Sequence, residues 1–156
     1  MKKRFGLALS FIAVAAIVGW FILRHQLQIS KGVFGIYLLE NNELVISDED
    51  VVWYNRTSHE IKLSTEGVRK IEALQVSLYG SPFVVRINGE KIYNGTFVTP
   101  ISSIPPPPSE VVIETLVQNN TIKIQKGYPP SQFANKDARD NPKIYDHFQK
   151  IGKLTQ

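Results

Sequence analysis

The chain has 156 residues, a hydrophobic fraction of 43%, a charged fraction of 21% and a formal net charge of +4. This composition is typical of a globular chain with one hydrophobic core, and it excludes wholesale disorder. Cysteine is absent from the sequence, which excludes disulfides, thiolate zinc sites, thiol nucleophiles and a lipoprotein cysteine. The modest positive charge does not indicate nucleic-acid binding, so we expect no nucleic-acid partner.

The N-terminal segment has the pattern of a membrane anchor. Lys2, Lys3 and Arg4 precede an uncharged apolar stretch over residues 5–23. As a helix, this stretch of about 19 residues would be about 28 Å long, close to the thickness of a bilayer's hydrocarbon core. The sequence therefore predicts a cytoplasmic tail, a transmembrane helix, a stalk and an outer domain, over residues 1–4, 5–23, 24–31 and 32–156.

A cleaved signal peptide is the alternative for this segment. Ala13 and Ala15 have the spacing of the small residues before a cleavage site, but the apolar stretch continues to Leu23. This length favours an uncleaved signal anchor. Because more basic residues precede the span than follow it, we expect a single-pass protein of the cell membrane. Its N-terminus would lie in the cytoplasm, its C-terminal domain outside, and residues 5–23 in the bilayer.

The first half of the outer domain mixes strand and helix patterns. Apolar clusters predict one strand over residues 35–39 and another over residues 59–63. Between them, Ser47 and Asp50 have the spacing of a capping box, which predicts a short helix beginning at Ser47.

A second helix follows the strand over residues 59–63. Ser64 or Thr65 can cap this helix, which would extend to Leu74. Val68 and Ile71 contribute to an apolar stripe along it.

The middle of the domain carries the clearest hairpin pattern in the sequence. A strand is predicted over residues 82–87, and Asn88-Gly89 supplies the two residues of a tight turn before a return strand over residues 90–93. The same dipeptide at residues 94–95 predicts another turn before residues 96–98. Four prolines at residues 105–108 then predict a stiff loop.

The last part of the chain contains a second hairpin and a terminal helix. The two strands are predicted over residues 111–117 and 121–126. Asn141 as N-cap, Pro142 at the first helical position and Gly152 beyond the end outline the helix. Its predicted buried stripe consists of Ile144, Phe148 and Ile151.

These patterns together predict an α+β fold. We expect a single N-terminal transmembrane helix followed by a small antiparallel-rich sheet with two or three packed helices.

Several of these segments carry a resemblance. Residues 47–51, 59–63, 65–67 and 83–93, together with residues 127–129 and 141–142, resemble an uncharacterised prokaryotic family of membrane-anchored or exported proteins, which implies no assigned reaction. Residues 47–101 are also similar, more weakly, to the extracytoplasmic head domain of the protein-export subunit SecD. That resemblance implies a fold and a side of the membrane, but function does not follow from fold.

Candidates for chemistry are few. His59, with Glu60, Asp48 and Asp50, is the set of residues that could support acid–base catalysis. No metal-binding spacing surrounds them, so a structural histidine and helix-capping acids are the competing interpretation. We expect no cofactor and no metal. Three N-x-S/T sites, at Asn55, Asn94 and Asn119, lie in predicted turns.

The function predicted from the sequence is that of a membrane-tethered extracytoplasmic binding or accessory module without an evident catalytic motif. Its partner would be a membrane or envelope protein, contacted through an exposed sheet edge or the basic C-terminal helix. The alternative is an extracytoplasmic hydrolase that uses His59 with nearby carboxylates.

Overall fold

The structure of the protein is a computed structural model that describes residues 33–102, 111–127 and 137–156. These residues belong to one folding unit, Val33–Gln156. The described elements, in chain order, are β1 (Phe34–Leu38), β2 (Leu44–Ser47), β3 (Val51–Asn55), β4 (Glu60–Leu63), α2 (Thr65–Ala73), β5 (Ser81–Ile87), β6 (Glu90–Val98), β7 (Val111–Glu114), β8 (Thr121–Lys126), α3 (Pro142–Lys150) and β9 (Leu154–Thr155).

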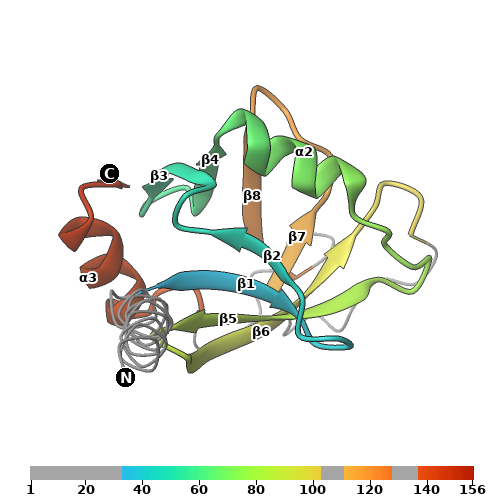
Figure 1. Cartoon of the computed structure of the whole chain (residues 1–156), viewed down its shortest axis with the longest axis horizontal. Helices are drawn as coiled ribbons and strands as arrows, with labels where there is room; N and C mark the ends of the chain where they lie inside the picture. Colours follow the sequence, from blue (N-terminus) through green and yellow to red (C-terminus); the bar gives the residue numbers. More distant parts are fainter. Residues whose placement is uncertain (1–32, 103–110, 128–136) are drawn as a thin grey trace, which may run out of the picture. The chain divides into compact units, whose positions relative to one another are not determined.

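The strands of the described chain form one sheet in the order β2-β1-β5-β6-β7-β8-β4-β3-β9. Most neighbouring strands are antiparallel, whereas β6 with β7 and β3 with β9 are parallel. The sheet curls on itself in Figure 1: β5 and β6 lie on its lower side, and β7 and β8 rise behind them toward β4 and β3. This curl lets one set of inward-facing side chains from all sides share a core.

The two described helices complete the core at different places. Helix α2 crosses the upper side of the curled sheet (Figure 1) and contacts both β2 and β4. Helix α3 contacts β5 and β9 and inserts Phe148, which is fully buried, between Phe34 of β1 and Tyr54 of β3. The largest fully buried side chains of the core include Tyr54, Phe34, Phe83, Phe97, Phe148, Ile36, Ile46, Ile61, Leu63 and Ile71.

The predicted α+β class is wrong, because the sheet dominates the described domain. A nine-stranded curled mixed sheet carries only two helices in the described ranges, each of nine residues. One reason is the segment that begins at Ser47, which forms a turn instead of the predicted short helix. The residues after it, from Val51 to Tyr54, are β-branched or aromatic and therefore fit a strand, in which Val51 and Tyr54 are buried.

The turn predicted at residues 94–95 is also wrong. Strand β6 runs through these residues without interruption, and Gly95 pairs with Phe83 of β5. A Cβ at Gly95 would collide with the Phe83 ring and with the Val111 carbonyl oxygen. The glycine is therefore required by close packing inside the sheet rather than by a turn.

Other local predictions are confirmed. Asn88 and Gly89 have φ values of 55° and 78°, and they connect β5 to β6 in the predicted hairpin. Strands β7 and β8 pair antiparallel. Helix α3 begins after Asn141, whose side chain accepts a hydrogen bond from the Lys143 amide. Its predicted stripe is partly wrong, since Ile151 is 37% exposed.

The predicted transmembrane helix and signal anchor, residues 5–23, lie outside the described residues, as do the tail, the stalk and the four prolines. Within the described ranges, no helix has the length and apolar character needed to cross a membrane, since α2 and α3 are short and amphipathic. The classification as a transmembrane, signal-anchored protein therefore has no support from the described residues and is not carried further.

Candidate functional site

His59 closes the turn between β3 and β4 and points into the domain. Its φ of 54° is in the left-handed region, and its carbonyl oxygen accepts a hydrogen bond of 2.9 Å from the Ile124 amide on β8. The residue is 7% exposed. Its Nδ1 lies 2.9 Å from the Tyr54 hydroxyl oxygen. The turn, β8 and Tyr54 together hold the imidazole in one place.

Two carboxylates from a distant part of the sequence lie beside His59. Asp140 Oδ1 is 3.7 Å from His59 Nε2 and accepts a hydrogen bond of 2.5 Å from the Tyr145 hydroxyl. Asp137 accepts hydrogen bonds from Arg139 Nε and Nη2 at 2.8 and 2.6 Å. One ligand atom from each of His59, Asp137 and Asp140 can be chosen so that all three lie within 4.8 Å of one another. These three residues, called the His59 cluster, offer the donor types that a metal ion requires.

Burial and charge set the protonation of this cluster. Burial lowers the pKa of His59, and the positive charge of Arg139 lowers it further. The hydrogen bond from Arg139 lowers the pKa of Asp137 to about 2, despite the opposing effect of burial. Burial raises the pKa of the Tyr54 and Tyr93 hydroxyls. At neutral pH the imidazole is therefore neutral, Asp137 is ionised and both tyrosines are protonated.

The structure separates the catalytic candidates predicted from the sequence. Glu60 accepts a hydrogen bond of 3.0 Å from the Ser58 hydroxyl. Asp48 lies 2.7 Å from His147 Nε2 and accepts a hydrogen bond from the Phe34 amide. Each of these acids therefore has local partners, and the carboxylates grouped with His59 are those of the His59 cluster.

Asp50 has a structural role of its own. It is 2% exposed and accepts hydrogen bonds from the Ser47 amide, the Ser47 hydroxyl and Lys70 Nζ. Burial raises the pKa of Asp50, but these hydrogen bonds outweigh it and leave the pKa below its ordinary value. The Asp50–Lys70 ion pair connects the β2–β3 turn to α2.

Sequence reasoning missed Asp137, Asp140 and Tyr54 as neighbours of His59. The pairing of β4 with β8 places Ile124 beside His59. Arg139 Nη1 donates a hydrogen bond to the carbonyl oxygen of the same Ile124, which brings the segment before α3 to His59. No local spacing encodes this arrangement. The one signal in the sequence was the group of charged residues Asp137, Arg139 and Asp140 directly before a capped helix.

The three N-x-S/T asparagines occupy different positions. Asn119 is exposed in the turn before β8, as predicted. Asn55 ends β3, where its side chain accepts hydrogen bonds from the Thr57 and Ser58 amides. Asn94 lies in the middle of β6, which corrects its predicted place in a turn.

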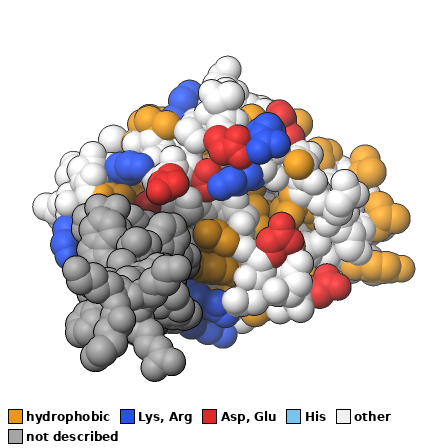
Figure 2. All heavy atoms as spheres, in the orientation of Figure 1, with side chains coloured by type: hydrophobic (Ala, Val, Ile, Leu, Met, Phe, Trp, Pro, Cys, Tyr) orange, Lys and Arg blue, Asp and Glu red, His pale blue; other side chains and the backbone are white. Residues whose placement is uncertain are grey.

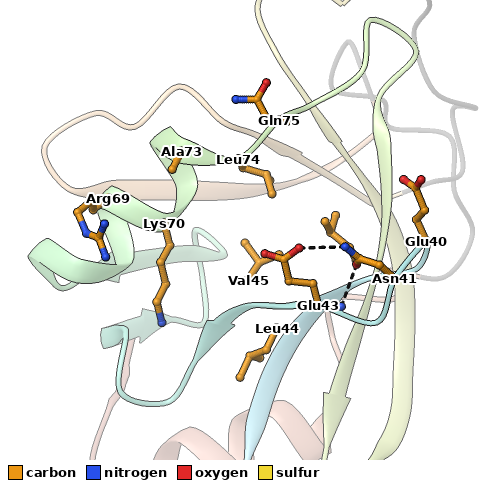
Figure 3. A pocket seen from close by; sticks show the side chains of 11 residues that line it. Glu40, Asn41, Glu43, Leu44, Val45, Arg69, Lys70, Ala73, Leu74 and Gln75 are labelled. Atoms are coloured by element: carbon orange, nitrogen blue, oxygen red, sulfur yellow. Dashed lines mark hydrogen bonds between the residues drawn. The ribbon is translucent and has the colours of Figure 1, made fainter.

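A separate hollow lies between β2 and α2, where the sheet has one of its two ends. Strand β2 is the terminal strand of the sheet and pairs with β1 on one side. The hollow, called the β2–α2 groove, has a volume of about 570 Å³. In Figure 3, residues of α2 form one wall and the β1–β2 connection forms the other. Its lining consists of Leu38, Glu40, Asn41, Glu43, Leu44, Val45, Arg69, Lys70, Ala73, Leu74 and Gln75.

Some charged side chains of the β2–α2 groove form ion pairs and others do not. Lys70 Nζ points toward the β2–β3 turn (Figure 3) and pairs with Asp50, and Arg69 pairs with the exposed Glu66. Glu43 makes hydrogen bonds with the Asn41 side chain. Neither Glu40 nor Glu43 forms an ion pair with a described residue. The free charge of this groove is therefore negative.

The surface around α2 combines charged and hydrophobic side chains. Figure 2 displays basic and acidic side chains next to one another over this helix, with hydrophobic side chains below it. Leu44 at the start of β2 is 41% exposed.

Comparison of the chain with protein-family models, with curated proteins and with solved structures gave no match.

Proposed function

We propose that the domain is a non-enzymatic binding module that holds an extended polypeptide segment in the β2–α2 groove. The observation that carries this proposal is the hollow of about 570 Å³ beside the terminal strand of the sheet. Its volume falls within the range of ligand-binding clefts. An extended segment can align with such a strand, where main-chain hydrogen bonds contribute affinity and side-chain pockets contribute specificity.

The shape of β2 restricts which segments can bind. This strand has four residues, and its pairing with β1 contains an irregularity between Ile36 and Tyr37. Short and irregular edge strands resist pairing with arbitrary chains. Helix α2 adds a second wall, so a bound segment must fit between strand and helix. The groove therefore favours a short segment of defined side chains over general strand addition.

The lining defines the chemistry of that segment. Leu38, Leu44 and Leu74 supply apolar surface, while Glu40 and Glu43 supply negative charge. A segment that carries a large apolar residue next to Lys or Arg satisfies both features. Asp and Glu at the same position would face like charges and bind less well.

The place of action and the partner stay predictions from the sequence. A location outside the cytoplasm and a partner protein of the membrane or envelope are compatible with this groove, which concerns only the chemistry of the bound segment. The resemblances to an exported family and to the SecD head domain likewise stay predictions.

The hydrolase alternative has less support from the geometry. His59 is buried, its Nδ1 is engaged by Tyr54, and the predicted partners Glu60, Asp48 and Asp50 have other contacts. General acid–base catalysis requires the histidine within hydrogen-bonding reach of a substrate. The β2–α2 groove is open, which favours binding as the function.

A direct test measures the binding of fluorescein-labelled peptides to the full chain by fluorescence anisotropy. One set of peptides alternates Leu with Lys, and a matched set alternates Leu with Glu. We expect saturable binding of the Leu/Lys set and weak or no binding of the Leu/Glu set. Amide chemical shifts in ¹H–¹⁵N spectra should change at residues 38–45 and 69–75.

Two substitutions distinguish specific binding in this groove from nonspecific binding elsewhere on the domain. Leu44→Ala should weaken binding of the Leu/Lys peptides by about tenfold or more, as removal of a central apolar contact does at other interfaces. Val52→Ala is the matched control, because Val52 is a strand residue that is 50% exposed and lies outside the groove. Equal losses in both variants, or shift changes confined to other elements, would overturn the proposal.

A further inference from the structure

We propose that the His59 cluster binds a divalent transition-metal ion through His59 Nε2 and one carboxylate oxygen each from Asp137 and Asp140. This site is separate from the β2–α2 groove and does not depend on peptide binding.

The donor positions are close to those that a metal requires. In a tetrahedral zinc site the ligand atoms lie about 3.3 Å apart, given metal–ligand distances of about 2.0–2.1 Å. His59 Nε2 and Asp140 Oδ1 are 3.7 Å apart. The Asp140 side chain is 62% exposed, so a small rotation can bring its oxygen to the ideal distance. The three ligands would leave at least one position for water.

A buried tyrosine provides independent evidence for a ligand at this place. Tyr93 is 6% exposed, and its hydroxyl has no hydrogen-bond partner among the described residues. The charges of Arg139 and Asp137 influence the pKa of this hydroxyl, so it lies within electrostatic range of the His59 cluster. Buried hydroxyls almost always have a partner. A water molecule bound to a metal ion in the His59 cluster would donate a hydrogen bond to the Tyr93 hydroxyl oxygen.

The surrounding contacts resemble the outer shell of a metal site. Tyr54 contacts His59 Nδ1, and this nitrogen can donate to the phenol oxygen so that the Nε2 lone pair faces Asp140. Tyr145 donates to Asp140, and Arg139 donates to Asp137. Such contacts orient metal ligands and tune their basicity. Each ligand of the His59 cluster therefore has a partner that fixes its direction.

The donor set selects the class of metal. An imidazole with two carboxylates suits Zn²⁺, Mn²⁺ and related transition metals better than Mg²⁺ or Ca²⁺, which prefer all-oxygen sites. The charges facing His59 are those of Asp137, Asp140, Arg139 and Lys123. Arg139 reduces the net negative charge, which favours a site with a strong nitrogen ligand over one held by charge alone.

The test titrates ZnCl₂ into the full chain at pH 7.5 by isothermal titration calorimetry. We expect one Zn²⁺ per chain, with MgCl₂ giving no comparable heat. Asp140→Asn keeps an acceptor for Tyr145 but removes a charged ligand, and it should raise the Kd for Zn²⁺ by at least about tenfold. Asp146→Asn is the matched control, because Asp146 is an exposed acid of α3 outside the cluster. This variant should bind Zn²⁺ like the unmodified protein.

A second measurement needs no substitution and therefore does not depend on a variant that folds. Long-range ¹H–¹⁵N spectra of the unmodified protein report each histidine separately. Zn²⁺ should shift His59 Nε2 at one equivalent and leave His25 and His147 unchanged. Zinc binding that shifts His25 or His147 instead, an Asp140→Asn variant with unchanged affinity, or the absence of Zn²⁺ binding would each overturn the proposal.

Discussion

Asp137 and Arg139 form a nearly buried ion pair at the entrance to α3. Their side chains are 16% and 14% exposed, and Asp137 also accepts a hydrogen bond from the Arg139 backbone amide. Arg139 extends further to the Ile124 carbonyl oxygen of β8. One residue pair therefore connects the segment before α3 to the sheet.

This pair predicts how stability depends on acid pH. Because the folded pKa of Asp137 is about 2, below the ordinary value of 3.8 for an aspartate, the ionised pair stabilises the fold fully above about pH 4. This contribution, about 2 kcal/mol, is lost as the pH falls through about 2. Asp137→Asn should therefore lower the free energy of unfolding at pH 6, and its difference from the unmodified protein should shrink toward pH 2. Urea unfolding at several pH values measures both effects.

Asp146→Asn is the control for this experiment as well, since Asp146 forms no ion pair with a described residue. Its free energy of unfolding should remain within about 0.5 kcal/mol of the unmodified protein at pH 6. A difference for Asp137→Asn that does not change with pH would contradict the assigned role of the ion pair.

At the level of single residues, the sequence indicated which residue types could support chemistry, but not which residues lie close together in the fold. His59 stands out because histidine is scarce, yet Asp137 and Asp140 are about eighty residues away along the chain and reach it through the pairing of β4 with β8. Asp50 was correctly expected to interact with Ser47, although the two residues close a turn instead of capping a helix.

At the level of elements, α2 depends on how its first turn is capped. The sequence left Ser64 and Thr65 open as the N-cap, and the structure assigns this role to Ser64. Its hydroxyl accepts a hydrogen bond of 3.1 Å from the Gly67 amide. Thr65 is the first residue of the helix and is exposed.

This assignment predicts different effects for two adjacent substitutions. Ser64→Ala should lower the free energy of unfolding by about 1 kcal/mol, because the Gly67 amide loses its acceptor. Thr65→Ala should be neutral or slightly stabilising, since alanine has the higher helix propensity. Thermal and urea unfolding of both variants check the difference. A larger loss for Thr65→Ala would show that the cap lies one residue later.

The two Asn-Gly dipeptides show why local patterns predict elements only in part. Asn88-Gly89 forms the expected hairpin turn, whereas residues 94–95 continue β6. The difference comes from Phe83, whose ring covers Gly95 across the strand pair. A turn and a glycine covered by an aromatic ring have the same local sequence, and only the partner strand distinguishes them.

At the level of the whole domain, α3 supplies a large apolar anchor to the curled sheet. The Phe148 ring lies parallel to Tyr54, with ring centroids 5.0 Å apart, and 4.9 Å from Phe34. Phe148→Ala should therefore lower the free energy of unfolding by about 3–5 kcal/mol. Gln149→Ala, at an exposed neighbouring position of α3, is the control and should change it by less than about 0.5 kcal/mol.

Chemical denaturation followed by circular dichroism measures this effect, in the near ultraviolet for aromatic packing and in the far ultraviolet for helix and sheet. Because Phe148 contacts both β1 and β3, we expect one cooperative transition at lower denaturant concentration for Phe148→Ala. Loss of α3 alone, with an intact sheet signal at the original midpoint, would contradict the role of α3 in closing the core.

The architecture of the domain was predictable only as far as its elements are local. The β5–β6 hairpin and both helices follow from turn and capping residues, and they are confirmed. The dominance of the sheet was not foreseen, because β2 and β9 are very short and β9 adds to the sheet through the distant strand β3. Short strands carry too few residues to show a period of two.

The order of the strands also determines how this protein reaches its native state. Phe34 pairs with Ile87, Ile61 with Ile122 and Tyr54 with Leu154, so three of the strand pairings that assemble the described sheet join segments that are distant along the chain. Closing such long loops costs entropy before any pairing compensates for it. We expect refolding on the slow scale of milliseconds to seconds that is typical of domains rich in non-local pairs. During this interval the β5–β6 hairpin, whose contacts are local, is the natural nucleus onto which the remaining strands assemble.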